Sequence, residues 1–202
     1  MKETPIFEEV SMHLFRQPGV ALKILIGGVL SFIPILNFFA FGYLYRVSLQ
    51  LRNSGQLVLP EWADWQGLFI DGIKFGVVWL AYWLVPLLVS GLLLGAFSAI
   101  GLAAIGMLFV SVAVIAASVL FAAALYRFQI RGELRELLEV VLIGRMACMY
   151  WQRFVLPVLA LTGLIALGLP LYGLAFFAAF LTFIIYSTVC FRFIEERKAT
   201  YS

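Results

Sequence analysis

The sequence predicts an all-α integral membrane protein with about five membrane-crossing helices and about three amphipathic helices in the membrane interface. Three observations support this fold class. The 202-residue chain is 64% hydrophobic and only 12% charged, whereas soluble domains average roughly 45–50% and about 25%. Its mean hydropathy is +1.05, and its charged residues are confined to four stretches of the chain. This composition excludes a soluble enzyme, a nucleic-acid-binding protein and a disordered adaptor.

Three blocks without a charged residue separate these stretches, and their lengths indicate how many helices cross the membrane. They cover residues 24–45, 75–126 and 154–191 and are 22, 52 and 38 residues long. A helix rises 1.5 Å per residue and the hydrocarbon core is about 30 Å thick, so one span needs ~20 residues. The first block therefore fits one span, and the other two fit one hairpin each. We expect turns near these residues: Gly95, Ser98, Gly101 and Gly106 in the second block, and Gly168, Pro170 and Gly173 in the third.

The first block also allows a re-entrant interpretation, in which two half-helices enter and leave the same face of the membrane. Gly27, Gly28, Pro34 and Asn37 interrupt its apolar run. An amide inside the membrane is costly unless it is hydrogen-bonded, and Asn37 follows a proline that frees backbone groups. We interpret Pro34 and Asn37 as a structural pair that caps a broken helix or pins a re-entrant turn, or alternatively as contacts for a transported substrate.

Three of the charged stretches precede an apolar block and have the residue spacing of an amphipathic helix. The first lies at about residues 6–14, the second begins at Pro60, and the third covers about residues 133–150. Such helices lie in the membrane interface with the apolar face toward lipid, or they pack on the helix bundle. Tryptophan and tyrosine residues near the block edges are typical of an interfacial aromatic belt.

Each apolar block ends in an aromatic residue followed by an arginine, at Arg46, Arg127 and Arg192. We interpret these arginines as anchors in the membrane interface. The pattern favours one multi-pass domain over residues 1–202 with a weak threefold repeat. The repeat units would be residues 5–46, 60–127 and 133–192.

The positive charges predict the orientation of the chain. Of the 14 Lys and Arg residues, 11 lie in the stretches 46–74, 127–153 and 192–202. These stretches share one side of the membrane if the second and third blocks are hairpins, and the positive-inside bias places that side in the cytoplasm. The amino terminus joins this side only if the first block is re-entrant.

Two runs, GGVLSFIPILNFFAFGYLYR (27–46) and LPEWADWQGLFIDGIK (59–74), resemble a family of bacterial and archaeal multi-pass membrane proteins, domain of unknown function 4013. The likeness rests on the Gly-Gly start, the spacing of Pro34 and Asn37, the aromatic-Arg exit and the Pro-Glu-Trp-x-x-Trp segment that ends in Asp71-Gly72. It covers about 50 residues, and the rest of the chain matches in hydropathy and spacing. The resemblance implies a multi-pass fold and supplies no activity. Its signature residues would be Pro34, Asn37, Pro60, Glu61, Trp62, Trp65, Asp71 and Gly72.

The distribution of polar groups argues against most membrane chemistries. The apolar blocks contain no ionisable side chain, which disfavours a proton-coupled transporter, an ion pump, a voltage sensor and most intramembrane hydrolases. A single histidine and two distant cysteines favour neither haem nor another cofactor. Gly91 and Gly95 form a GxxxG motif that suits helix contacts within the chain or between two copies.

The acidic residues of the second amphipathic stretch are the main candidate site. Glu61, Asp64 and Asp71 lie there beside Trp62 and Trp65. We interpret them as helix-start residues that favour the helix dipole, or as a face that docks a partner. A shared metal ion is disfavoured because no His or Cys accompanies them. Lys74 follows Asp71 by three residues and is expected to pair with it.

These observations favour a non-catalytic membrane scaffold or accessory subunit, without a cofactor, whose interfacial helices dock a partner. It would reside in the inner membrane of a prokaryote, with most charged segments in the cytoplasm. We expect it to contact membrane lipids and no nucleic acid, and to form a homo-oligomer or part of a larger complex. The alternatives are an oligomeric transport or channel component for a small neutral or lipidic solute, and a membrane-shaping hairpin protein.

Overall fold

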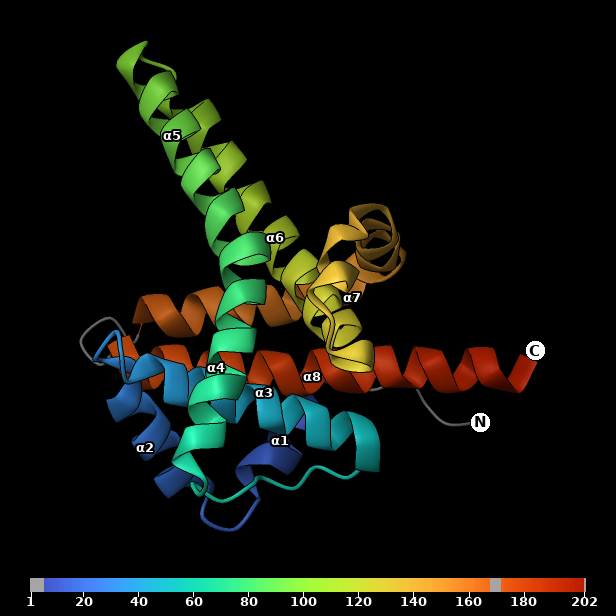
Figure 1. Cartoon of the computed structure of the whole chain (residues 1–202). Coiled ribbons are helices and arrows are strands. Elements are labelled where there is room, and N and C mark those ends of the chain that lie inside the picture. The colour runs from blue at the N-terminus through green and yellow to red at the C-terminus, as the bar shows by residue number, and fades with distance from the viewer. Residues whose placement is uncertain (1–5, 168–171, 202) are drawn as a thin grey trace. The chain divides into compact units, whose positions relative to one another are not determined.

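The computed structural model of the chain describes residues 6–167 and 172–201, and these residues form helices and no strand (Figure 1). The elements are α1 (Phe7–Phe15), α2 (Val20–Ser31), α3 (Asn37–Ser54), α4 (Trp65–Trp79), a π-helical turn η1 (Leu80–Leu84), α5 (Val85–Ala99), α6 (Ala103–Arg131), a 3₁₀ turn η2 (Leu134–Leu138), α7 (Val140–Leu167) and α8 (Tyr172–Tyr201).

The described helices confirm the predicted all-α class. Three of them are long and apolar enough to cross a membrane, namely Trp65–Ala99, Ala103–Ile130 and Gly173–Glu196. The number rises to five if each of two bent pairs counts as one span. One pair is α1 with α2, at 95°, and the other consists of the two arms of α7, at 86°. The chain is therefore a membrane protein with three to five candidate spans and further helices.

The chain divides into two compact units. The first unit contains residues 1–76 and 159–202, and the second contains residues 77–158. The prediction of one domain with a threefold repeat stays a prediction.

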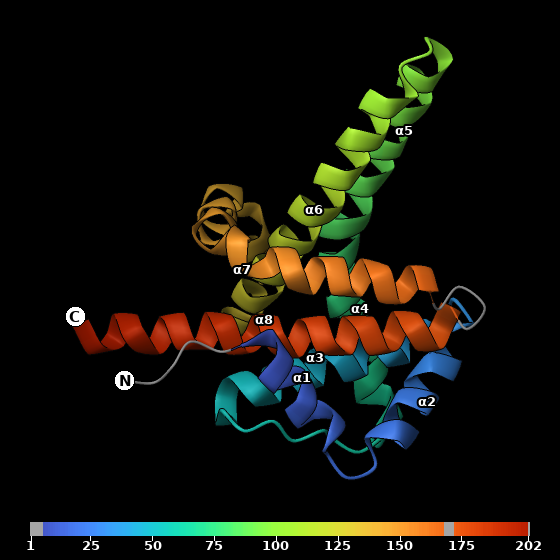
Figure 2. The same ribbon diagram turned by 180° about the vertical axis from the view of Figure 1, so that it is seen from behind.

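Helix α8 forms the centre of the first unit, where it packs against α1, α2 and α3 (Figure 2). Its side chains Phe177 and Phe180 are fully buried. Helix α2 approaches α8 closely through Gly27 and Gly28, because a Cβ at these positions would overlap Phe177 and Leu174. Burial of large aromatic side chains against glycine backbone thus builds the core of this unit.

Helices α3 and α4 of the first unit also cross through glycines. A Cβ at Gly42 would overlap the backbone oxygen of Leu68, and a Cβ at Gly72 would overlap that of Phe38. The two glycines therefore face each other's helix with no side chain between the backbones. This crossing holds the start of α4 against α3.

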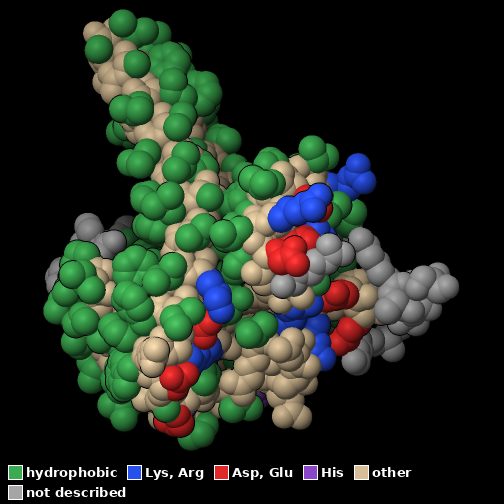
Figure 3. Space-filling model, in the orientation of Figure 1, with side chains coloured by type: hydrophobic (Ala, Val, Ile, Leu, Met, Phe, Trp, Pro, Cys, Tyr) green, Lys and Arg blue, Asp and Glu red, His purple; other side chains and the backbone are tan. Residues whose placement is uncertain are grey.

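The second unit contains the hairpin of α5 and α6, which turns at Ile100–Leu102. Gly101 has φ 78°, a left-handed conformation that glycine adopts without strain, so the expected turn is confirmed. Val85 N–H donates to the oxygen of Leu80 in the π-helical turn that precedes Pro86, a residue without an N–H of its own. Trp83 Nε1 donates to Ser118 Oγ on α6 at 3.1 Å. Figure 3 shows hydrophobic side chains over the visible face of this hairpin.

Three expected boundaries differ from the structure. The first block is not one helix, because α2 ends at Ser31 and α3 begins at Asn37. The second amphipathic stretch is not a separate helix from Pro60, because α4 begins at Trp65 and continues to Ala99. The third stretch is a 3₁₀ turn followed by the start of α7. Of the expected third turn, Gly168 and Pro170 lie outside the described residues and Gly173 lies inside α8.

Candidate functional site

The five predicted docking residues lie on the segment before α4 and on its first turns. Asp64 sets the start of the helix. Its carbonyl accepts Leu68 N–H at 2.9 Å and its Oδ1 accepts Gly67 N–H at 3.2 Å. Asp64 has φ 53°, in the left-handed region that aspartate tolerates better than most residues. It is therefore the capping residue of α4.

Side chains from other helices hold the segment before Asp64 in a non-helical conformation, which explains why no helix begins at Pro60. Tyr43 Oη donates to the carbonyl of Pro60 at 3.0 Å. Lys23 Nζ donates to the carbonyl of Leu59 at 2.8 Å and to Glu61 Oε1 at 2.9 Å. Tertiary hydrogen bonds here outweigh the local preference of proline for a first helical position.

Arg46 on α3 joins the two ends of this segment. Its Nη2 lies 2.8 Å from Asp64 Oδ2 and its Nε lies 2.9 Å from Asp71 Oδ2. Nη1 donates to the carbonyl of Ala63 at 3.3 Å. The hydrogen bond from Arg46, followed by that from the Gly67 N–H, holds the pKa of the Asp64 carboxyl below its ordinary value. All three guanidinium nitrogens thus bind the start of α4, a fork geometry that lysine cannot supply.

Asp71 is the largely buried member of the acidic set. Its Oδ1 accepts Lys74 Nζ at 3.0 Å, so the predicted pair is confirmed. The Lys74 ammonium also lies 5.8 Å from the ring centroid of Tyr45, within cation–π range. Asp71 therefore bridges two cations of its own unit.

The two tryptophans of the segment have different roles. Trp62 stacks on Tyr43, with ring centroids 4.2 Å apart and planes at 15°, and its Nε1 is buried without a hydrogen-bond partner among the described residues. Trp65 instead leaves 48% of its surface exposed. Trp65 is the more exposed of the two and offers more of its ring to a ligand or partner.

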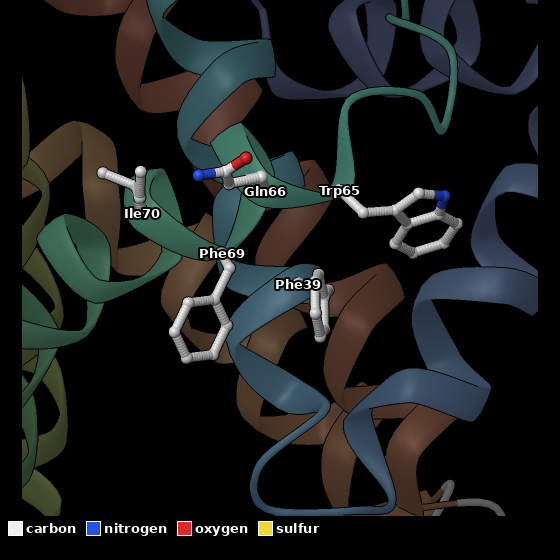
Figure 4. A pocket seen from close by; sticks show the side chains of 5 residues that line it. All are labelled: Phe39, Trp65, Gln66, Phe69 and Ile70. Carbon is white, nitrogen blue, oxygen red and sulfur yellow. The ribbon is translucent and has the colours of Figure 1, made fainter.

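Trp65 borders an open cavity of about 520 Å³ at the start of α4 (Figure 4). Its other lining residues are Phe39, Gln66, Phe69 and Ile70. Phe39 packs edge-on against Trp65 at 5.6 Å and lies 5.5 Å from Phe69. The cavity is aromatic with one amide in its wall. Among the described residues, no three His, Cys, Asp or Glu side chains gather as a metal site requires.

A family model described as Protein of unknown function (DUF4013) matches residues 26–161. The chain belongs to this family. The comparisons with curated proteins and with solved structures gave no match. The DUF4013 match confirms the resemblance, which rested on residues 27–46 and 59–74, and extends it into α7. It includes the whole cavity and the five predicted docking residues.

Pro34 and Asn37 of the DUF4013 region lie at the break between α2 and α3. The N–H of Asn37 donates to the carbonyl of Ile33 at 2.8 Å. Its Oδ1 is buried and accepts no hydrogen bond from a described residue, and no side chain caps α3. The structural role of Pro34 and Asn37 at this break and their alternative role as substrate contacts both stay predictions.

The three predicted anchor arginines bind neighbouring groups within their units. Arg46 is described above. Arg127 Nη2 contacts Glu136 and Glu139, the latter at 2.7 Å. Arg192 Nη1 donates to the carbonyl of Leu51 near the end of α3 at 3.0 Å, where a cation favours the helix dipole. The sequence marked Arg192 but not its partner Leu51, and it did not show that Lys23 and Tyr43 bind the segment before α4. Residues on separate helices leave no local pattern.

Proposed function

We propose that the chain is a non-catalytic scaffold or accessory subunit that docks a membrane partner at the cavity beside Trp65. Its setting would be the inner membrane of a prokaryote, with the charged segments on the cytoplasmic side. The observation that carries this proposal is the half-exposed Trp65 ring beside an open aromatic cavity. Exposed tryptophan beside a pocket is typical of the residues that dominate binding energy at protein interfaces.

The surroundings of the cavity favour docking over catalysis. The nearby carboxylates of Glu61, Asp64 and Asp71 are each bound to a cation of the chain, so none is poised as a base. Arg46 and the glycine crossing fix the first turns of α4. A rigid binding surface lowers the entropy cost of association. The partner we expect is a membrane protein that inserts an apolar side chain between Phe39, Trp65 and Phe69.

The test is native mass spectrometry of the full chain purified gently at its natural expression level. The wild type is expected to carry a stoichiometric second protein, and Trp65→Ala is expected to weaken its retention at least about tenfold. Trp151→Ala is the matched control, because Trp151 lies in the other unit and is 52% exposed against 48% for Trp65. A wild type that carries only lipid, or a Trp65→Ala variant that keeps the partner, would show that the proposal is wrong.

A further inference from the structure

A second open cavity, of about 360 Å³, lies at the start of α7 in the second unit. It is lined by Leu138, Glu139, Val140, Val141, Leu142 and Arg145. Figure 3 shows Lys and Arg side chains next to hydrophobic side chains over this part of α7. The cavity is separate from the one beside Trp65 and has a different chemistry, with an apolar wall and one charge of each sign.

The apolar wall is unusually accessible. Leu138 is 79% exposed and Val141 is 80% exposed, values that are costly for large aliphatic side chains in water. A membrane protein can place such side chains in the boundary between headgroups and acyl chains. Helix α7 supports this location, because its two arms are bent by 86°. Such a bend allows the first arm, which carries the cavity, to lie along the interface while the second arm enters the membrane.

The two charged residues of the cavity both retain hydrogen-bonding capacity. Arg145 is exposed and forms no ion pair with another residue in the described part of the chain. Glu139 Oε2 accepts a hydrogen bond from Arg127 Nη2 at 2.7 Å. Its other oxygen, Oε1, accepts no hydrogen bond from a described residue. Although both line the cavity, Glu139 and Arg145 do not pair with each other. The cavity thus offers one guanidinium fork and one carboxylate oxygen.

We propose that this cavity binds the headgroup of a phospholipid that carries a primary ammonium. Its phosphate binds the guanidinium of Arg145, which suits a bidentate contact. Its ammonium donates to Glu139 Oε1, and its glycerol and upper acyl chains lie against Leu138, Val140 and Val141. A phosphatidylglycerol headgroup offers the Glu139 carboxylate only neutral hydroxyl donors and no cation, and a choline headgroup has no N–H to give.

The experiment is native mass spectrometry of the full chain with equimolar phosphatidylethanolamine, phosphatidylcholine and phosphatidylglycerol of identical acyl chains. The wild type is expected to retain phosphatidylethanolamine best. Arg145→Gln is expected to lower that retention about tenfold, since it removes a charge-assisted pair. Glu139→Gln is expected to remove the preference for ethanolamine over choline.

Arg135→Gln is the matched control, because Arg135 is exposed on η2 and does not line the cavity. Glu139→Gln also alters the contact with Arg127, so the decision rests on Arg145→Gln, which breaks no ion pair among the described residues. Equal retention of the three lipids, a preference for phosphatidylglycerol, or equal losses in Arg135→Gln and Arg145→Gln would each overturn the proposal.

Discussion

Arg46 and Arg127 each follow a tyrosine and each bind two carboxylates, yet the two centres are built differently. Arg46 uses Nε for Asp71 and Nη2 for Asp64, and its Nη1 reaches the carbonyl of Ala63. Arg127 uses Nη2 for both Glu136 and Glu139, and its Nε is buried without a hydrogen-bond partner among the described residues. The Arg46 guanidinium therefore donates hydrogen bonds from all three of its nitrogens, whereas Arg127 binds both of its carboxylates through one nitrogen.

The positions of the acids along the chain account for this difference. Arg46 reaches residues 18 and 25 positions later, which lie on both sides of the start of α4. Arg127 reaches residues 9 and 12 positions later, on one short turn. The side chain of Asp64 is 65% exposed and that of Glu136 is 5% exposed. The side chain of Asp71 is 19% exposed and that of Glu139 is 48% exposed. Each centre thus joins one exposed and one largely buried carboxylate, and Glu136 is the most deeply buried of the four.

Two pairs of glycines differ in the helix contacts that they permit, although Gly106 of the second unit also approaches the backbone of Leu94 closely. In the first unit, Gly42 and Gly72 bring two backbones together. In the second unit, a Cβ at Gly91 or Gly95 would meet no described atom within 4 Å. The GxxxG motif therefore does not serve a contact within the described chain. A glycine's contribution to stability depends on the crossing it permits, not on its presence in a motif.

The largest expected effect is at the glycine crossing. Gly42→Ala or Gly72→Ala forces a methyl group into a backbone carbonyl that no rotamer change can relieve, and should cost at least about 3 kcal/mol of unfolding free energy. Gly91→Ala and Gly95→Ala are the controls, and should be neutral or stabilising by up to about 1 kcal/mol. Thermal unfolding of the full chain in one detergent measures all four variants. Equal shifts for the two pairs would contradict this difference between the units.

The sequence predicted features that depend on local chemistry. Charge-free blocks indicated the candidate spans, Gly101 fell at the turn between α5 and α6, and the spacing of Asp71 and Lys74 gave their ion pair. In each case the determining interaction lies within a few residues or follows from burial of apolar surface. The family resemblance likewise rested on contiguous motifs.

Long-range contacts account for what the sequence did not predict. Pro60 favours a helix start, but hydrogen bonds from Tyr43 and Lys23 keep that segment non-helical. The helix therefore begins only at Trp65. The pairing of Lys23 with Glu61 joins residues 38 positions apart. Composition also made Trp62 and Trp65 look alike, whereas stacking on Tyr43 leaves Trp62 less exposed than Trp65. The aromatic cavity could not be predicted without the crossing of α3 and α4.

An intermediate effect is expected when each arginine loses its charge. Arg127→Gln should cost about 3 kcal/mol, because Glu136 is nearly buried and loses a cation. Arg46→Gln should cost about 1–2 kcal/mol, because Asp64 is open to water and Asp71 still binds Lys74. Chemical or thermal unfolding of both variants at neutral pH gives the two values. If Arg46→Gln is as costly as Arg127→Gln, the deeper burial of Glu136 does not determine the cost of losing the arginine.

The smallest expected effect concerns pH at the open side of the Arg46 centre. Arg46 and the Gly67 N–H hold the folded-state pKa of Asp64 below its ordinary value of 3.8. A carboxyl whose pKa is lowered by folding stabilises the fold above its unfolded pKa, and this contribution is lost as the pH falls through the folded value.

Asp64→Asn removes the charge but keeps a residue type that tolerates the left-handed conformation and can accept the Gly67 N–H. The melting temperature of the wild type should therefore exceed that of Asp64→Asn at pH 6, and the gap should narrow below about pH 4. A gap that stays constant from neutral to acidic pH would mean that Asp64 acts through its capping geometry and not through its charge, and that the exposed ion pair adds nothing to the Arg46 centre.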